Sequence, residues 1–494
     1  MPQNYDVVII GGGVVGCMTA RFLSRTSLSI LLIEKDADIG MGASSANSAI
    51  VHAGYDPVPG SLKAKTNVAA NAIWDTVAGE LSIPFDRRGD YVVAVGSEEL
   101  PGLEKLLEQG RQNGVPGMHI ISAEEMRHRE PNINPAVSGA LWAPTGGICD
   151  PFMATVAAAE NAVQNGVTLL LETAFEGFIL DGRKVAGVHT SRGDFGCRWV
   201  INAAGMYADA VMHKAGTHPE FKITPRRGEY MILDKAEITI NNVLFPVPSE
   251  KGKGILVTAS LHGNTLVGPN AQVLDDPEDT AVTREGLDDT WSGARKLIPG
   301  LSPRGVIAVF AGLRAMGNAP CKTPGVDYHH DFLIECDAEV QGLINLGGIE
   351  SPGLTAAPAI ALMVMDLMKE AGEKLEYKRS WNPIRPPRPR FHELNREAQD
   401  ALIRQDPRYG RMICRCEEIT EGEIVAEIHA PIPARTYDAI KRRTWLGTGR
   451  CLGSFDMPRV VEILSRELGV SPFEITKKGH NSAFLQRETK NLEA

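Results

Sequence analysis

Apolar residues at the start of the chain fall into short, continuous runs separated by glycine-rich or charged stretches. Val7–Ile10 and Ile30–Ile33 are each wholly apolar, a pattern typical of strands buried on both faces of a parallel sheet. The intervening segment 14–24 has the composition of a helix. A strand, a helix and a second strand in this order predict an α/β layer.

The same alternation continues along the chain. Strands are expected at 91–95, 167–171, 185–190, 198–204 and 343–348, and helices at 69–79, 100–114, 149–166 and 356–371. Between 228 and 270 short apolar runs alternate with turn residues, which indicates an antiparallel sheet.

A boundary follows the last of these helices. Four prolines and three arginines alternate between 383 and 390, and neither a helix nor a strand interior accepts this pattern. We therefore expect a first domain over 1–380, a linker over 381–406 and a separate unit over 407–494. A helix is expected in the last unit at 420–429.

Composition limits the class of protein. The 494 residues are 43% hydrophobic and 23% charged, with a net charge of −10, which argues against nucleic acid as the main partner. A local basic pocket for an anionic substrate is compatible with this charge. No apolar run is long enough to span a membrane, and the first strand leaves no room for a signal peptide. We expect a cytoplasmic protein, with peripheral membrane contact left open.

Glycines between the first strand and the first helix indicate the first candidate binding site. Gly11, Gly13 and Gly16 have the G-x-G-x-x-G spacing, which lets a pyrophosphate approach backbone N–H groups at a helix N-terminus. Glu34 ends the second strand, where it can accept hydrogen bonds from ribose hydroxyls, and Lys35 follows it. This combination predicts a dinucleotide site. The alternative is a glycine-rich turn in an unrelated α/β unit.

The loop at 40–48 consists of small and polar residues, including Ser44, Ser45, Asn47 and Ser48. Small side chains let the backbone pass beneath a large flat ring, and the hydroxyls can bond phosphate or ribityl oxygens. On composition alone, an ordinary loop is an equal alternative.

Four stretches carry a specific resemblance: 47–64, 227–230, 266–271 and 347–358. Over about 375 residues the chain resembles the D-amino-acid-oxidase-like FAD oxidoreductases. Within them it is most similar to type II glycerol-3-phosphate oxidases and dehydrogenases and to L-2-hydroxyglutarate dehydrogenases. The resemblance implies a fold of mixed α/β and α+β class. It comprises a glutathione-reductase-like FAD-binding Rossmann domain (about 1–80, 145–220 and 325–375) and a substrate domain with a mostly antiparallel sheet (about 81–144 and 221–324).

The same resemblance implies a set of cofactor-binding residues. These are Gly11, Gly13, Gly16, Glu34, Lys35, Ser44, Ser45, Asn47, Ala204, Gly205, Gly348, Gly353, Leu354 and Thr355. The segment 351–355 opens a helix, and its N–H groups would stabilise negative charge on a flavin or a bound anion.

Oxidation of a secondary alcohol needs a base for the hydroxyl proton, and histidine suits that role at neutral pH. His52 follows the flavin loop and is our candidate base. By resemblance, Ser48, Lys253, Arg314 and Ser351 bind the substrate. Lys253 lies in a Gly-Lys-Gly context, which favours a phosphate, although from the sequence alone a solvated hairpin lysine is the simpler interpretation.

The implied reaction is oxidation of sn-glycerol 3-phosphate to dihydroxyacetone phosphate, with hydride transfer to flavin N5. Two alternatives stay open: an L-2-hydroxyglutarate dehydrogenase, and a flavin electron-transfer subunit of a larger dehydrogenase complex. Oxygen, a quinone or a partner protein are all compatible electron acceptors.

Three of the eight cysteines cluster near the C-terminus, at Cys414, Cys416 and Cys451. Their spacing resembles the bacterioferritin-associated-ferredoxin-like [2Fe–2S] domain, a small and mainly helical unit, but Asp456 occupies the position of its fourth cysteine. Because clusters usually have four thiolate ligands, the sequence favours loss of the cluster. An iron site completed by Asp456 and a zinc site are the alternatives.

Overall fold

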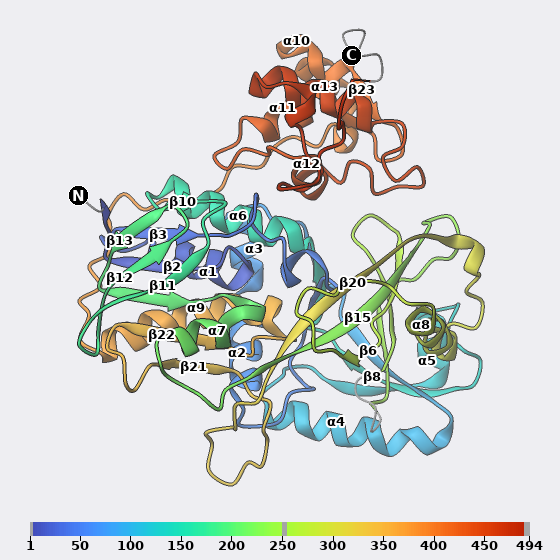
Figure 1. Ribbon diagram of the computed structural model, residues 1–494. Helices are drawn as coiled ribbons and strands as arrows, with labels where there is room; N and C mark the ends of the chain where they lie inside the picture. The colour runs from blue at the N-terminus through green and yellow to red at the C-terminus, as the bar shows by residue number, and fades with distance from the viewer. Residues whose placement is uncertain (1–2, 249–253, 489–494) are drawn as a thin grey trace.

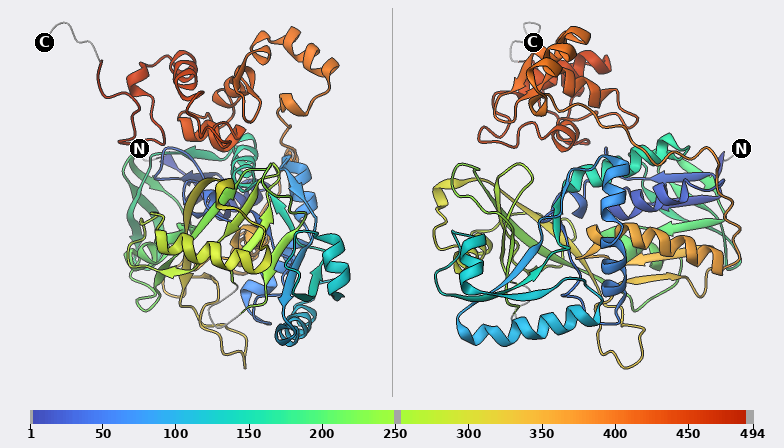
Figure 2. Two further views of the ribbon diagram at one scale, coloured as in Figure 1. Left: turned by 90° about the vertical axis from the view of Figure 1, so that its right-hand side faces the viewer. Right: turned by 180° about the vertical axis from the view of Figure 1, so that it is seen from behind.

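The computed structural model describes residues 3–248 and 254–488. Figures 1 and 2 show three parts: a Rossmann-like domain, a second domain built on a large sheet, and a helical unit that lies across one side of both. The first and third parts belong to the expected α/β and helical classes, and the second is α+β.

A six-stranded sheet forms the centre of the first domain. In spatial order its strands are β10 (Thr168–Leu170), β3 (Ile30–Ile33), β2 (Val7–Ile10), β14 (Trp199–Asn202), β22 (Leu343–Gly347) and β21 (Leu333–Cys336). All neighbouring strands are parallel except β21 and β22.

Alternate residues of the strands bury against different layers. Val7 and Ile9 pack against α1 (Val14–Leu23), α6 (Pro151–Gln164) and α9 (Gly353–Glu370). Val8 and Ile10 instead face a second sheet. That sheet contains β1 (Gln3–Asn4), β13 (Gly193–Gly196), β12 (Lys184–Thr190) and β11 (Phe175–Asp181). The continuous apolar runs are therefore explained by burial on both faces.

The second domain is built on a nine-stranded sheet. Its strands are β19 (Gln272–Val273), β15 (Ile223–Leu233), β18 (Thr265–Gly268), β17 (Leu256–Ala259), β16 (Val243–Pro246), β6 (Asp90–Val95), β8 (Val137–Ala143) and β7 (His119–Ser122), with β20 (Val306–Gly317) paired to β15. All pairs are antiparallel except β16 with β6. Its helices are α4 (Leu100–Gln112), α5 (Ala123–Arg129) and α8 (Arg284–Leu297).

Three predicted helices differ from those observed. The helix expected at 69–79 is wrong: α2 (Leu62–Asn71), capped by Ser61, ends before α3 (Trp74–Leu81) begins. The helix expected at 149–166 begins only at Pro151, since Cys149 pairs in β9 (Gly147–Cys149) with β4 (Ile50–Val51) and β5 (Phe85–Asp86). The helix expected at 356–371 begins three residues earlier, at Gly353.

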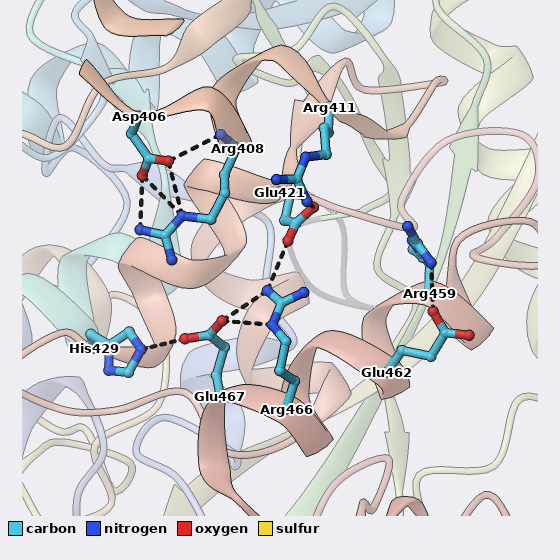
Figure 3. Close-up of polar contacts among 9 residues, drawn as sticks. All are labelled: Asp406, Arg408, Arg411, Glu421, His429, Arg459, Glu462, Arg466 and Glu467. Atoms are coloured by element: carbon cyan, nitrogen blue, oxygen red, sulfur yellow. Dashed lines mark hydrogen bonds and ion pairs between the residues drawn. The ribbon is translucent and has the colours of Figure 1, made fainter. Parts of the chain in front are cut away.

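The C-terminal unit has its own apolar core. It contains α11 (Glu421–Ile428), α12 (Tyr437–Thr444), α13 (Met457–Leu468) and the short hairpin of β23 (Met412–Cys414) and β24 (Ile419–Thr420). Thr420 and Glu423 form a capping box at the start of α11. Figure 3 shows the ion pairs that join its elements: Glu421 accepts from both Arg411 and Arg466, at 2.9 and 2.7 Å.

The segment 381–406, expected to be a linker, is bound to the first domain and includes α10 (Arg396–Gln405). Arg385 and Arg388 both donate to Glu160 of α6 at 2.6 Å, and Arg388 also donates to Glu427 of α11 at 2.7 Å. A stiff proline-rich segment thus holds the C-terminal unit against α6.

A buried ion cluster completes this attachment. Asp38, in the loop after β3, accepts hydrogen bonds from Arg442 and Arg443 of α12 at 2.6 to 2.8 Å. Burial opposes ionisation of Asp38, but the two guanidinium groups outweigh it and lower the pKa of the carboxyl to about 2. Nearby, Trp445 donates to Asp150 at 2.8 Å.

We expect Asp38→Asn to weaken docking of the C-terminal unit by about 3 kcal/mol, because it leaves two buried guanidinium groups without their counter-charge. Since the folded-state pKa is depressed, this stabilisation is complete above the ordinary carboxyl pKa and is lost as the pH falls towards 2. Thermal denaturation and proteolysis within 381–406 measure the effect. Asp366→Asn, which removes an exposed pair with Lys369, is the control and should change stability by less than about 1 kcal/mol. Equal stability of the two variants would contradict this role for Asp38.

Candidate functional site

A cavity of about 1490 Å³ lies between the first two domains. Its walls come from the glycine loop after β2, the ends of β3, β14 and β22, the loop at 41–48, and strands β15 and β20 of the second domain. This volume exceeds that of an ordinary small-ligand pocket, so one cavity has room for a dinucleotide and a small substrate together. Its position at the carboxyl ends of parallel strands is where ligands of open α/β sheets bind.

The glycine loop has the backbone geometry that its sequence predicts. Gly11 has a φ of +108°, and a Cβ there would lie 2.4 Å from the carbonyl oxygen of Ala203. A Cβ on Gly16 would lie 2.0 Å from the carbonyl oxygen of Gly11. Both positions therefore need glycine, and Gly13 caps the N-terminus of α1.

Glu34 and Ser44 are tied to this loop. The Glu34 carboxylate accepts from the N–H groups of Gly12 and Asp36 at 2.6 and 3.0 Å, and burial raises its pKa in spite of these bonds. Ser44 Oγ accepts from the N–H of Val14 at 2.9 Å. Glu34, directly after β3, is thus fixed beside the N-terminus of α1, and it lines the cavity.

The residues predicted to bind the cofactor fall into two groups. Those on the cavity wall are Gly11, Gly13, Glu34, Lys35, Ser44, Ser45, Asn47, Ala204, Gly205, Gly353 and Leu354. Lys35 Nζ lies 4.1 Å from the centre of the Tyr207 ring, and Asn47 binds backbone groups of its own loop.

Gly16, Gly348 and Thr355 lie behind the wall and support it. Gly348 has a φ of +65°, and a Cβ there would lie 3.1 Å from the Cα of Gly317. Thr355 is buried, and its hydroxyl accepts from the backbone N–H of His52 at 2.9 Å. These residues affect the site by fixing the position of the backbone around it.

His52 lies on the cavity wall beside the N-terminus of α9. Its carbonyl oxygen accepts from Asn67 and Asn71 at 3.2 and 3.0 Å. Its Nε2 is 3.4 Å from Ser351 Oγ, and its ring centre is 6.0 Å from that of Phe245. Hydrogen bonds to the backbone N–H and to the carbonyl oxygen of His52 therefore fix this segment. The imidazole Nε2 faces the hydroxyl of Ser351, a residue predicted to bind substrate.

Arg314 projects from β20 into the same cavity and is half-buried. Its Nη2 donates to the carbonyl oxygens of Asn270 and Arg227 at 2.7 and 3.3 Å, and its Nε donates to that of Arg226 at 3.4 Å. Burial lowers its pKa, the charge of Glu350 opposes this shift, and no carboxylate among the described residues forms an ion pair with it. The carbonyl oxygens fix the plane of the guanidinium group and leave its charge available to an anion.

Sequence reasoning missed an ion pair in the cavity wall. Lys63 donates to Glu350 at 2.7 Å and to the Tyr328 hydroxyl at 3.2 Å. Burial would raise the pKa of Glu350, but Lys63, Arg314 and Arg226 together lower it. Glu350 precedes Ser351, and Lys63 falls in the 47–64 stretch, yet nothing in the sequence indicates that the two side chains meet.

Ser48 and Ser351 are also on the cavity wall. Lys253 lies outside the described residues. The site therefore brings together His52, Ser48, Ser351 and Arg314 with most of the dinucleotide residues, and Arg226 adds a second cation that the sequence did not single out.

The fold and this cavity define a dinucleotide-dependent oxidoreductase. A profile of the FAD dependent oxidoreductase family matches residues 6–367, and one of the BFD-like [2Fe–2S] binding domain matches 412–466. The chain belongs to the FAD dependent oxidoreductase family, with a C-terminal domain of the BFD-like class. The glycine cradle, Glu34 and the volume of the cavity fit FAD.

Relatives of known structure or curated activity agree with this assignment. A glycerol 3-phosphate dehydrogenase from Caloramator mitchellensis is 45% identical over 99% of both chains. The structure of an L-alpha-glycerophosphate oxidase from Mycoplasma pneumoniae with FAD bound is 33% identical, covers 78% of this chain and 100% of its own, and superposes with a TM-score of 0.72. The human mitochondrial L-2-hydroxyglutarate dehydrogenase is 32% identical over 54% of this chain and 61% of its own.

Among the described residues, no helix is both long and apolar enough to span a membrane.

Proposed function

We propose that this enzyme oxidises sn-glycerol 3-phosphate to dihydroxyacetone phosphate. The observation that carries the proposal is a single cavity lined by the nucleotide-binding loop, the His52–Ser351 contact and the guanidinium group of Arg314. An alcohol bound between the imidazole and Arg314 would present its carbon to the flavin side of the cavity.

His52 would act as the base. Its imidazole takes the proton of the C2 hydroxyl while the C2 hydrogen leaves as hydride, so that the alcohol carbon becomes a carbonyl. Bound FAD supplies the two-electron acceptor, at N5. Ser351, 3.4 Å from His52 Nε2, orients the imidazole and the substrate hydroxyl.

The anionic end of the substrate would bind Arg314 and Arg226. A guanidinium group offers two parallel donors to a phosphate. Lys253 and Ser48 are proposed as further phosphate and hydroxyl contacts. A second candidate substrate, L-2-hydroxyglutarate, would place a carboxylate on the same cations. The identity of 45% over nearly the whole chain to a glycerol 3-phosphate dehydrogenase favours the phosphate.

Anaerobic titration of the purified yellow protein tests the substrate. We expect glycerol 3-phosphate to bleach the flavin absorbance with one equivalent per flavin, and L-2-hydroxyglutarate to bleach it at least about 10²-fold more slowly, since a planar carboxylate satisfies fewer of the donors placed for a tetrahedral phosphate. Bleaching by L-2-hydroxyglutarate alone would overturn the proposal.

The physiological acceptor of the electrons is proposed to be oxygen, a quinone or a partner protein. Turnover of the isolated chain with an artificial dye would support an independent enzyme. Inactivity with the dye until a partner is added would instead support an electron-transfer subunit.

A further inference from the structure

Asn270 lies in the loop between β18 and β19, and it joins the guanidinium group of Arg314 to a buried carboxylate. Its carbonyl oxygen accepts from Arg314 Nη2 at 2.7 Å, which is the shortest of the hydrogen bonds described for this guanidinium group. A Cβ on Gly228 of β15 would lie 3.2 Å from the same Nη2, so the strand leaves the group little room to shift. Asn270 is 7% exposed and lines the cavity. Its carbonyl oxygen therefore sets where the charge of Arg314 lies.

The side chain of Asn270 is held by Glu229 of β15. Asn270 Nδ2 donates to Glu229 Oε2 at 2.6 Å, and Asn270 Oδ1 accepts from the backbone N–H of Glu229 at 2.8 Å. Nδ2 also donates to the carbonyl oxygen of Gly286 in α8 at 3.2 Å. Both polar atoms of the amide are thus hydrogen-bonded, and the loop is fixed to the strand and to the helix at the residue that contacts Arg314.

Glu229 is a fully buried carboxylate at the start of α8. Its Oε1 accepts from the backbone N–H and the hydroxyl of Thr283 at 2.5 and 2.9 Å. A Cβ on Gly286 would lie 1.3 Å from its Oε2, so the first turn of α8 packs directly on the carboxylate. Burial of a carboxylate is costly unless hydrogen bonds compensate it, and an apolar side chain would fill the same space at lower cost. The charged group is therefore explained by the groups that it holds, Thr283 and the amide of Asn270.

We propose that Glu229 and Asn270 are positioning residues for the anionic end of the substrate. Glu229 orients the amide of Asn270, and the carbonyl oxygen of Asn270 fixes the guanidinium group of Arg314 in the plane that meets the anion. The inference rests on the proposed function, because it assigns the support of the proposed phosphate contact. Since the two residues act through Arg314, their loss should weaken anion binding much more than it slows the chemical step.

The amide and the carboxylate can be exchanged between the two positions. In Asn270→Asp two carboxylates face each other, and in Glu229→Gln two amides do, so each single variant loses the 2.6 Å hydrogen bond. We expect each to weaken binding of inorganic phosphate by about 10-fold, the usual effect of one lost hydrogen bond. When Glu229→Gln is combined with Asn270→Asp, an amide again donates to a carboxylate. The affinity should then return to within about threefold of the unmodified chain, because only the longer bond to Gly286 stays lost.

The test uses the full chain with FAD bound and inorganic phosphate as the probe, so that calorimetry measures binding without turnover. Asn132→Asp makes the same charge change at an exposed asparagine outside the cavity wall. It is the matched control and should bind phosphate like the unmodified chain. In an Arg314→Met background, Asn270→Asp should change the phosphate affinity by less than about twofold, because the guanidinium group through which it acts is already absent. Flavin reduction by glycerol 3-phosphate should show a similar loss of affinity, with the rate at saturating substrate reduced by less than about threefold.

Unchanged phosphate affinity in both single variants, with a loss of thermal stability alone, would leave Glu229 and Asn270 a structural role and overturn the proposal. An equal loss of affinity in the presence and absence of Arg314 would overturn it too, as would no phosphate binding by the unmodified chain. The same holds if the exchanged pair has a normal FAD content but does not recover affinity. If Asn270→Asp does not fold, Asn270→Ser takes its place, because it removes the amide without adding charge.

The anaerobic titration of the unmodified chain tests the proposed function separately. A chain whose phosphate affinity depends on Asn270 and Glu229, but whose flavin glycerol 3-phosphate does not bleach, would contradict the proposed function and retain this inference. Normal bleaching together with unchanged phosphate affinity in the variants would contradict the inference alone.

Discussion

Replacing His52 with alanine is expected to slow anaerobic flavin reduction by glycerol 3-phosphate by about 10²–10⁴-fold, the usual contribution of a positioned base. The backbone at this position is held by Thr355 on one side and by Asn67 and Asn71 on the other. The substitution therefore removes the imidazole while the segment keeps its place. Stopped-flow reduction at saturating substrate measures the chemical step directly.

The pH dependence provides a second readout. A histidine base works only when its imidazole carries no proton, so the rate of the unmodified enzyme should rise with pH, and His52→Ala should lose that rise. His189→Ala, which removes an exposed histidine paired with Asp194 on the second sheet of the first domain, is the control and should retain both rate and profile. A His52→Ala enzyme with the unmodified rate and profile would exclude this residue as the base.

The sequence predicted the parts of the fold that are set by local patterns. The buried strands β2 and β3 are continuous apolar runs, β14 and β22 are apolar apart from Asn202 and Asn345, and both α1 and α4 were predicted to within two residues at each end. The glycine fingerprint also predicted geometry, because Gly11 and Gly16 leave no room for a side chain. These features can be predicted from the sequence because glycine alone meets the steric requirement at these two positions.

Features set by tertiary contacts could not be predicted in the same way. Cys149 continues the helical pattern of α6 but pairs with Phe85 in a small sheet. The proline-rich segment has the composition of a linker, yet Glu160 binds two of its arginines. In both cases the deciding partner is distant in sequence.

The candidate site shows the same division. His52, Ser351 and Arg314 were singled out through motif resemblance, and all three line one cavity. Lys63 and Glu350 were missed because their significance comes from a contact across 287 positions of sequence. Arg226 was missed because it is an unremarkable arginine in a strand until β15 pairs with β20 and places it beside Arg314.

The second large effect is expected at Arg314. Three carbonyl oxygens bind its Nε and Nη2, whereas its Nη1 donates no hydrogen bond to any described residue. The group is thus held in one plane, and its free edge is available to a phosphate. Arg314→Met keeps much of the apolar stem but removes the charge. We expect it to weaken glycerol 3-phosphate binding by about 10²-fold, or ~2.7 kcal/mol, the range for a hydrogen bond to a charged group.

Inhibition by inorganic phosphate separates this role from a general disturbance of the cavity. Phosphate carries the anionic end of the substrate without its alcohol, so Arg314→Met should lose phosphate inhibition in proportion to its loss of substrate affinity. The rate of flavin reduction at saturating substrate should fall much less, because His52 and Ser351 remain in contact. Arg304→Met removes an exposed arginine at the turn before β20. It should leave both the affinity for glycerol 3-phosphate and the inhibition by phosphate unchanged. Undiminished phosphate inhibition in Arg314→Met would show that the anion binds elsewhere in the cavity.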